Sequence, residues 1–326
     1  MEAQDLGEQG LLKLIQNFCP QDIVGDDAAV VTFPPEANLV ATTDILIDRV
    51  HFSNQTTSPF DVGYRGATAN LSDIAAMGAN PIGITVALAV PPHTCVTWIE
   101  QLYQGLSACL GKYNTPILGG DIARSQVKVM SITALGQVKP QRVIKRKNAQ
   151  IGDAIVTTGL HGVSRAGLEL LLSPEKGKNL SEEQKARLIS AHQRPEPRLD
   201  VLPILAAILG DNWRVGGMDS SDGLADAVSQ ICQSSGVGAR IYQKDLPVPP
   251  GLPLICPQDL VWDWILYGGE DFELILTLPP AQAKILVNVL DKDAKIIGEV
   301  TAESKILLIG EDKVEELTLK SGFQHF

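Results

Sequence analysis

The chain has 326 residues and a mass of 35.0 kDa, with 44% hydrophobic and 20% charged residues, a globular composition that excludes fibrous and disordered classes. This length is sufficient for two domains, each with its own core. The formal net charge of -11 argues against general nucleic-acid binding. It also means that any phosphate ligand must be held by metal ions, Arg or Lys, or backbone amides that reverse the local field.

The apolar periodicity of the first 138 residues predicts alternating helices and strands. The helix predicted over residues 61–77 has small residues on one face and Asp73 near its C-terminal end, which would let another backbone or a ligand come close. The order of elements fits a split α/β layer better than a regular parallel sheet. The elements expected here are helices 6–18, 61–77 and 95–111 and strands 28–32, 39–46, 82–90, 116–118 and 127–138.

A basic connector, residues 139–148, separates this part from a second α/β block, and its charges fit either a solvated linker or an anion contact. The strand predicted at 154–158 leads through a glycine-rich turn, 159–162, into a helix at 163–172. Free amides at such a turn could hold an anion, although most such turns are structural. The other elements expected are helices 181–192, 198–209, 223–234 and 280–291 and strands 239–242, 273–278, 295–300 and 306–309.

The domain boundary is therefore predicted near residue 148, with domains at 1–148 and 149–326 and an α/β (α+β) fold class for the whole chain. The five cysteines include no Cys-x-x-Cys pair, which predicts reduced thiols in a cytoplasmic protein. No basic region followed by an apolar run opens the sequence, and the longest apolar stretch, 82–92, is too short to span a bilayer. We expect neither export nor a membrane partner.

Six segments place acidic residues in apparent loops of Gly, Ser or Thr: 25–28, 42–44, 70–73, 119–121, 219–223 and 268–271. Each one alone is ordinary turn chemistry. However, most of them follow or interrupt apolar runs, and strand ends converge on the binding site in α/β proteins. Because several carboxylates in one place repel each other unless hard cations lie between them, the set predicts an oxygen-ligated site for several Mg²⁺ ions that carry nucleotide phosphates.

Other kinds of site lack their motifs. The chain contains no P-loop, no Gly-x-Gly-x-x-Gly loop, no protein-kinase motif set and no Gly-x-Ser-x-Gly nucleophile. Its five histidines are isolated, which disfavours zinc. Phosphoryl transfer by metal-bound carboxylates remains, and Arg146, near the end of the basic connector, is the natural cation to neutralise the moving phosphoryl group.

Together these segments resemble those of the thiamine-monophosphate kinases, a family of the aminoimidazole-ribonucleotide-synthetase-like ATP-binding superfamily. The resemblance covers nearly the whole chain in the same order. It rests on Gly-Asp-Asp-Ala-Ala at 25–29, Thr-Thr-Asp at 42–44, His-Phe at 51–52, Asn-Leu-Ser-Asp-Ile-Ala-Ala-Met-Gly-Ala at 70–79, Gly-Gly-Asp at 119–121, Ser-Ser-Asp-Gly at 220–223, Gly-Gly-Glu-Asp-Phe-Glu at 268–273 and Gly-Phe-Gln-His-Phe at 322–326.

The resemblance implies a role for particular positions. The magnesium ligands would be Asp27, Thr42, Thr43, Asp44, Asp73, Asp121, Asp219 and Asp222. The ATP contacts would be Gly120, Asp121, Arg146, Ser221 and, with a looser alignment, Tyr103. The thiamine-monophosphate contacts would be His51, Glu270 and Phe323. Within these sets, Arg146, Asp44 and Asp121 are expected to act in catalysis.

The resemblance also implies a two-domain fold whose N-terminal halves pair into a β-barrel across a homodimer. In the implied reaction, the γ-phosphoryl group of ATP passes to the phosphate of thiamine monophosphate, giving thiamine diphosphate and ADP. The nucleophile is an ionised phosphate oxygen, so no strong general base is needed. Two departures from the family pattern are Ile122, where Thr is common, and the lack of a Trp before Gly322.

Two other readings remain open. One is a different ATP-dependent enzyme of the superfamily, although Cys19, at a helix end before Pro20, does not fit the reactive cysteine of a selenophosphate synthetase. The other is a nucleotide- or metal-binding protein that has lost turnover, since a fold does not fix a function.

Overall fold

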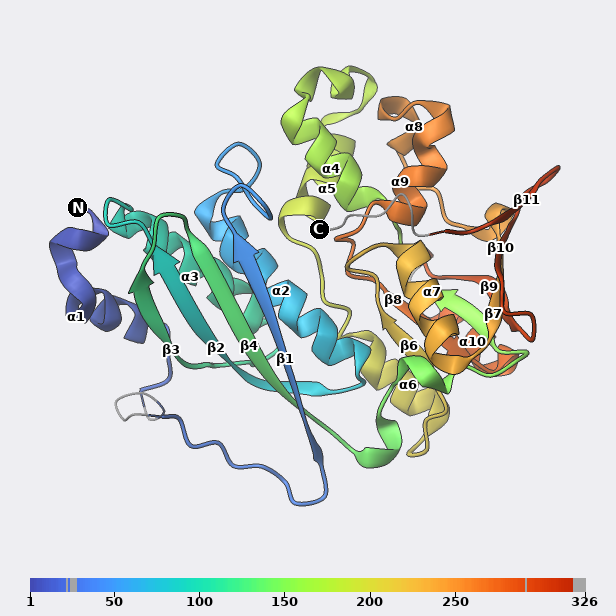
Figure 1. The fold of residues 1–326 in the computed structure, drawn as a ribbon, viewed down its shortest axis with the longest axis horizontal. Coiled ribbons are helices and arrows are strands. Elements are labelled where there is room, and N and C mark those ends of the chain that lie inside the picture. The colour runs from blue at the N-terminus through green and yellow to red at the C-terminus, as the bar shows by residue number, and fades with distance from the viewer. Residues whose placement is uncertain (22, 24–27, 291, 319–326) are drawn as a thin grey trace. The chain divides into compact units, whose positions relative to one another are not determined.

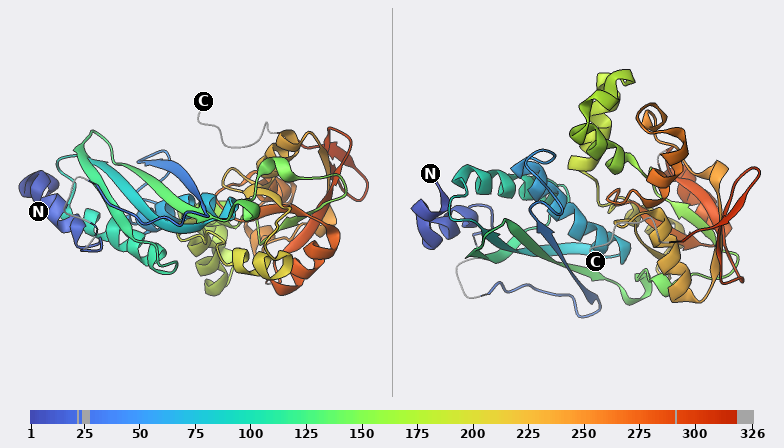
Figure 2. Two further views of the ribbon diagram at one scale, coloured as in Figure 1. Left: turned by 90° about the horizontal axis from the view of Figure 1, so that it is seen from below. Right: turned by 45° about the horizontal axis from the view of Figure 1, so that its top comes forward.

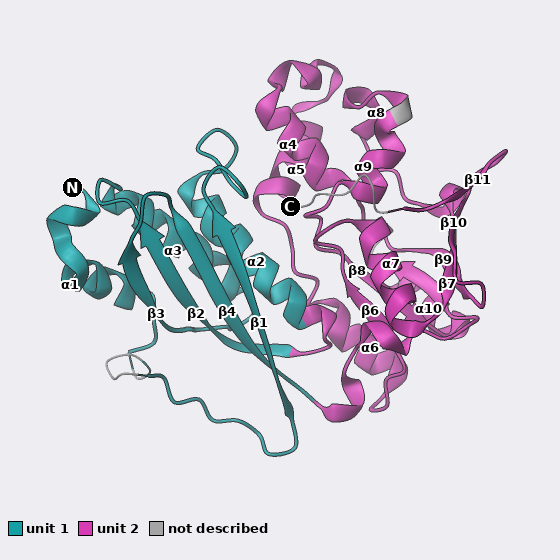
Figure 3. Cartoon of the chain, in the orientation of Figure 1, with its two compact units in different colours: residues 1–74, 80–138 teal, residues 75–79, 139–326 magenta. Residues whose placement is uncertain are grey.

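The computed structural model describes residues 1–21, 23, 28–290 and 292–318. The chain forms two compact units, one of residues 1–74 and 80–138 and the other of residues 75–79 and 139–326 (Figure 3). Each unit has its own sheet and helices. In the described part of the chain, no helix is long and apolar enough to cross a membrane.

The first unit is a four-stranded sheet with helices on one face (Figures 1 and 2). The strand order is β1-β4-β2-β3, in which β4 runs antiparallel to β1 and β2, and β3 runs parallel to β2. Its elements are α1 (Ala3–Gln16), β1 (Asn38–Ile47), α2 (Pro59–Ala76), β2 (Asn80–Val90), α3 (Val96–Gly111), β3 (Ile117–Arg124) and β4 (Val129–Val138).

Side chains of β4 alternate between the two faces of this sheet, as expected when only one face is covered. Met130 and Ile132 are buried, whereas Ser131 and Thr133 are half-buried.

The small residues predicted on α2 have the expected effect, because a Cβ atom at Gly63 would lie 1.9 Å from the Leu102 carbonyl oxygen. Helices α2 and α3 therefore pack in backbone contact.

The second unit contains a seven-stranded mixed sheet in the order β11-β10-β7-β9-β5-β8-β6. The strands are β5 (Ala154–Thr157), β6 (Gly216–Asp219), β7 (Gly238–Tyr242), β8 (Leu274–Leu278), β9 (Lys295–Thr301), β10 (Ile306–Ile309) and β11 (Val314–Glu316). The helices are α4 (Val163–Leu172), α5 (Glu182–Gln193), α6 (Val201–Leu209), α7 (Leu224–Ser235), α8 (Leu252–Ile255), α9 (Val261–Tyr267) and α10 (Pro280–Val289), with short 3-10 turns such as Arg146–Asn148.

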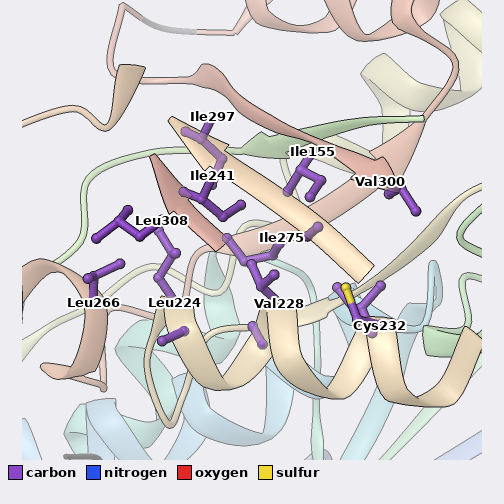
Figure 4. Packing of buried hydrophobic residues seen from close by; sticks show 14 of the residues in the cluster. Ile155, Leu224, Val228, Cys232, Ile241, Leu266, Ile275, Ile297, Val300 and Leu308 are labelled. Carbon is purple, nitrogen blue, oxygen red and sulfur yellow. The ribbon is translucent and has the colours of Figure 1, made fainter. Parts of the chain in front are cut away.

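Helix α7 covers one face of this sheet with an apolar stripe. Leu224, Val228 and Ile231 pack against strand residues that include Ile155 and Ile275, and all five are at most 1% exposed (Figure 4). Burying a side chain of this size stabilises the fold by about 1.5–3 kcal/mol. A second cluster joins α4, α5, α8 and α9. The core thus fixes where α7 begins, directly after the loop that follows β6.

Most predicted elements are confirmed, but one strand is wrong and several are missed. Residues 28–32 form no strand, and Val30 among them is 93% exposed. Strands β6 and β11 and helices α8 and α9 were not predicted. The expectation that the acidic segments are all loops is also wrong, since residues 42–44 lie inside β1, Asp73 inside α2 and residues 119–121 inside β3.

Candidate active site

The first unit brings three of the predicted magnesium ligands to the helix-covered side of its sheet. Thr42 and Asp44 alternate with Thr43 along β1, and their cross-strand partners on β4 are the buried Ala134 and Ile132. Thr42 Oγ1 donates a hydrogen bond to Asp73 Oδ2 on α2. This group supplies only carboxylate and hydroxyl oxygens, which are the ligands that Mg²⁺ prefers.

Two other predicted ligands of this unit, Thr43 and Asp121, lie on the opposite face of the same sheet. Thr43 pairs with Thr133, and the two hydroxyl oxygens are 2.5 Å apart. Asp121 lies opposite Ala87 of β2 and is exposed, and its Oδ1 accepts a hydrogen bond of 2.8 Å from the Ile122 amide. The sheet therefore separates Thr43 and Asp121 from Asp44.

Gly120 has a steric role as well as a predicted contact with ATP. A Cβ atom at this position would lie 1.9 Å from the Val86 carbonyl oxygen of the neighbouring strand. Only glycine lets β3 pair with β2 this closely, and the pairing fixes the position of Asp121.

His51 and Tyr103, two further predicted contacts, differ in exposure. His51 is half-buried after β1, and its Nδ1 accepts a hydrogen bond of 3.0 Å from the Ile47 amide. Tyr103 is 1% exposed, and the centroid of its ring is 5.5 Å from that of Phe18. Burial raises the pKa of the Tyr103 phenol. The structure places Tyr103 in the core of the first unit rather than on an accessible surface.

In the second unit, Asp219 ends β6, and Ser221 and Asp222 lie in the loop that leads from this strand into α7. Asp219 lies opposite Leu274 in the antiparallel pair of β6 and β8, so this loop meets the segment that precedes β8. The Glu270 amide donates to the Ser221 carbonyl oxygen at 2.7 Å. Ser221 Oγ donates to Asp219 Oδ1 at 3.3 Å. The structure thus connects two of the predicted segments, 219–223 and 268–271.

The turn 159–162 binds an anionic group of its own chain. Asp271 accepts hydrogen bonds from the Gly162 amide at 2.7 Å and the Ser164 amide at 2.8 Å, at the start of α4. Burial raises the pKa of Asp271 to about 7, even though the two amides favour its charged form. Since these two amides are engaged by Asp271, the structure supports the structural interpretation of the turn rather than its use as a ligand site.

His161, in the same turn, is a residue that the sequence left unassigned. Its Nε2 lies 2.9 Å from Ser220 Oγ, and its Nδ1 lies 3.3 Å from Thr157 Oγ1. Burial lowers the pKa of His161 to about 3, which keeps the imidazole neutral at physiological pH. The sequence feature that could have drawn attention to His161 is its place between Gly159 and Gly162, directly after a strand. The spacing of the histidines could not do so, because His161 has no other histidine near it in the sequence.

Glu270, a predicted substrate contact, lies in a constrained segment. Its φ is 57° and that of Phe272 is 53°, and both values lie in the left-handed region that residues other than Gly rarely adopt. Glu270 Oε2 is 3.9 Å from Nδ1 of His192, a residue that is 2% exposed. The same nitrogen is 3.1 Å from Ser164 Oγ. Strained backbone of this kind is common at functional sites.

Arg146, the predicted catalytic cation, is exposed beside α7. Its Nη1 donates to Gln230 Oε1, and Gln230 Nε2 donates to Asp226 Oδ2 at 2.5 Å. Ser235 Oγ donates to the Arg146 carbonyl oxygen at 2.8 Å. Arg146 therefore belongs to the same unit as Ser221, and α7 supports both its main chain and its guanidinium.

Elsewhere in the basic connector, Lys139 and Arg142 form ion pairs with Asp211 at 3.3 and 2.7 Å, so part of its charge is neutralised locally. Asp27 and Phe323 lie outside the described residues. Within the part of the chain that the structure describes, no three His, Cys, Asp or Glu side chains are grouped so that they could hold a metal ion.

Comparisons with known proteins agree with this architecture. Residues 25–138 match the AIR synthase related protein N-terminal domain, and residues 150–310 match the corresponding C-terminal domain. The thiamine-monophosphate kinase of Synechococcus elongatus is 50% identical over 324 residues, which cover 99% of this chain and 97% of that protein.

Two solved structures are also similar over most of their length. Thiamine-monophosphate kinase from Stenotrophomonas maltophilia K279a is 31% identical with a TM-score of 0.78, over 89% of this chain and 90% of that one. AaThiL complexed with AMPPCP and TMP is 30% identical with a TM-score of 0.77, over 100% of this chain and 99% of that one. The chain therefore belongs to the thiamine-monophosphate kinase family of the AIR synthase related proteins.

Proposed function

We propose that this protein transfers the γ-phosphoryl group of ATP to thiamine monophosphate, producing thiamine diphosphate and ADP as the last step of thiamine diphosphate synthesis. The observation that carries the proposal is 50% identity to a thiamine-monophosphate kinase over 99% of this chain. The similar structure with AMPPCP and TMP bound supports the same pair of substrates, ATP and thiamine monophosphate.

We infer that the protein uses several Mg²⁺ ions. The donors offered by Thr42, Asp44 and Asp73 are hard oxygens with one hydroxyl–carboxylate contact already formed, and Asp219 adds a carboxylate in the second unit. Thr43 and Asp121, on the opposite face of the sheet, would serve a different ion from Asp44, and Asp27 and Asp222 complete the proposed set. When bound, Mg²⁺ would neutralise phosphate charge and hold the two substrates in register for transfer.

The chain's own residues contribute charge and position. The nucleophile is a phosphate oxygen that is already ionised at neutral pH, so the reaction needs orientation rather than a strong base. Arg146 has five N–H donors, of which the contact with Gln230 uses one, so the guanidinium can still bind phosphoryl oxygens. Gly120 and Ser221 are proposed for ATP, with Tyr103 the weaker candidate because its side chain is 1% exposed, and His51, Glu270 and Phe323 are proposed for thiamine monophosphate.

We also propose a homodimer that pairs the sheets of two first units into a barrel. The sheet face opposite α2 supports this idea, because it carries exposed apolar residues, Leu39 at 56% and Ile45 at 48%, next to half-buried Thr133. Exposed apolar residues on one sheet face are typical of an interface. Residues 1–148 would then serve ATP, Mg²⁺ and dimerisation, residues 149–326 would complete the active site, and the enzyme would act in the cytoplasm.

The decisive experiment incubates the purified protein with ATP, MgCl₂ and thiamine monophosphate and separates thiamine species by chromatography. Free thiamine in a parallel reaction tests which acceptor is used, and Asp44→Asn protein controls for contaminating kinase. Thiamine diphosphate formed from the monophosphate by the wild type alone would confirm the proposal. ATP binding without product would refute it and indicate a different reaction or a binding protein.

A further inference from the structure

Ser220, which follows Asp219 at the end of β6 and precedes Ser221 in the next loop, has no role assigned so far. Ser220 points into the protein, is 1% exposed, and lies 2.9 Å from Nε2 of His161. Its Oγ also donates to the Glu273 carbonyl oxygen at 3.0 Å, and its amide donates to the same oxygen at 2.9 Å. Ser220 is therefore anchored by both its side chain and its main chain.

The imidazole that meets Ser220 is itself fixed. His161 is 1% exposed, and its other nitrogen, Nδ1, lies 3.3 Å from Thr157 Oγ1 at the end of β5. The next residue, Gly162, has φ of 83° and donates its amide to Asp271. The imidazole of His161 therefore has a hydroxyl neighbour at each ring nitrogen, and its turn is held by the bond from Gly162 to Asp271. A side chain held in this way can fix the position of the loop that it contacts.

We propose that His161 is a positioning residue: its hydrogen bond to Ser220 sets the position of Asp219 and Ser221 for binding Mg²⁺-ATP. His161 acts only through Ser220, because the proposed ligands are the neighbours of Ser220 in the chain. The inference rests on the proposed function, in which Asp219 holds metal and Ser221 contacts ATP. Turnover should therefore be sensitive to the geometry that His161 imposes and not only to the stability it provides.

The test compares three replacements. In His161→Leu an apolar group faces Ser220, whereas in His161→Gln a side-chain amide can still reach it. Ser220→Ala removes the other partner. Val300→Ala is a control for general destabilisation, because Val300 is a core residue near the C-terminal end of β9 and is 2% exposed. For each protein we would measure the Kd of Mg²⁺-ATP by calorimetry, kcat and KM for both substrates, and Tm.

We expect His161→Leu and Ser220→Ala each to raise the Kd and KM for Mg²⁺-ATP about tenfold, the loss expected when a buried hydrogen bond is broken. The loss in the double variant should be clearly smaller than the sum of the two single losses, because both substitutions remove the His161–Ser220 contact, although Ser220→Ala also removes the bond to the Glu273 carbonyl oxygen. His161→Gln should recover most of the affinity, and Val300→Ala should lower Tm without changing the Kd.

A purely structural role would give a different pattern. If His161→Leu lowers Tm as Val300→Ala does but leaves the Kd and KM for Mg²⁺-ATP unchanged, or if the effects of His161→Leu and Ser220→Ala add, the proposal is wrong. Failure of the wild type to form thiamine diphosphate would refute the proposed function instead, and the calorimetric Kd values would still decide the role of His161.

Discussion

Replacing Gly120 by Ala should disrupt the pairing of β2 and β3, the strands that place Asp121. The added Cβ would lie 1.9 Å from the Val86 carbonyl oxygen and 2.9 Å from its carbon, whereas ordinary contacts are 3.4–4 Å. The obstacle is backbone, which cannot rotate away as a side chain would. The strands must therefore separate by about 1.5 Å, the difference between the contact at Gly120 and the closest ordinary distance.

Forcing extra atoms into a packed region costs about 1–3 kcal/mol, and this contact falls at the upper end, at about 3 kcal/mol. Urea unfolding followed by circular dichroism would give this loss of stability. Hydrogen exchange of peptides from β2 and β3 would locate it. We also expect a higher KM for ATP, because Asp121 follows Gly120 directly.

Gly111→Ala, at the end of α3 in the same unit, is the matched control. A Cβ atom there meets nothing within 4 Å, and Ala favours a helix over Gly by up to about 1 kcal/mol. This control should be unchanged or slightly more stable. If Gly120→Ala were as stable as Gly111→Ala, with normal protection in β2 and β3, the steric argument would fail.

Three further results are expected. Asp44→Asn should lower kcat at least about 100-fold at matched Mg²⁺ with an unchanged Tm, because it removes a charge that the metal needs; wild-type turnover would contradict the metal assignment. Phe323→Ala should weaken binding of thiamine monophosphate about tenfold and that of ATP much less, and equal losses in calorimetry would argue against ring stacking. Burial lowers the pKa of folded His161 to about 3 from 6.5, so between these values only the unfolded chain binds the proton. Lowering the pH below 6.5 should therefore reduce wild-type stability, relative to His161→Gln, by about 1.4 kcal/mol per pH unit. Asp271, with its pKa raised to about 7, has the opposite effect, but both proteins retain it; parallel urea curves from pH 4.5 to 7.5 would contradict this assignment for His161.

Much of this protein follows from sequence alone. Hydrophobic periodicity located most helices and strands, because apolar side chains recur at the period of each element. The acidic segments and Arg146 indicated a phosphoryl-transfer site, since carboxylates and hydroxyls at these positions suit hard cations. These features are local, so a single chain reveals them.

Tertiary structure decided what depends on partners distant in sequence. Residues 119–121 resemble a loop, yet they form part of β3 because β2 lies beside them and supplies hydrogen-bond partners for their backbone groups. Strand β6, with two glycines in four residues, has no strand signal of its own and exists because β8 pairs with it. Residues 28–32 have a strand-like sequence but, among the described residues, pair with no strand. The role proposed for His161 likewise depends on tertiary structure, because its hydrogen-bond partner Ser220 lies 59 positions further along the chain.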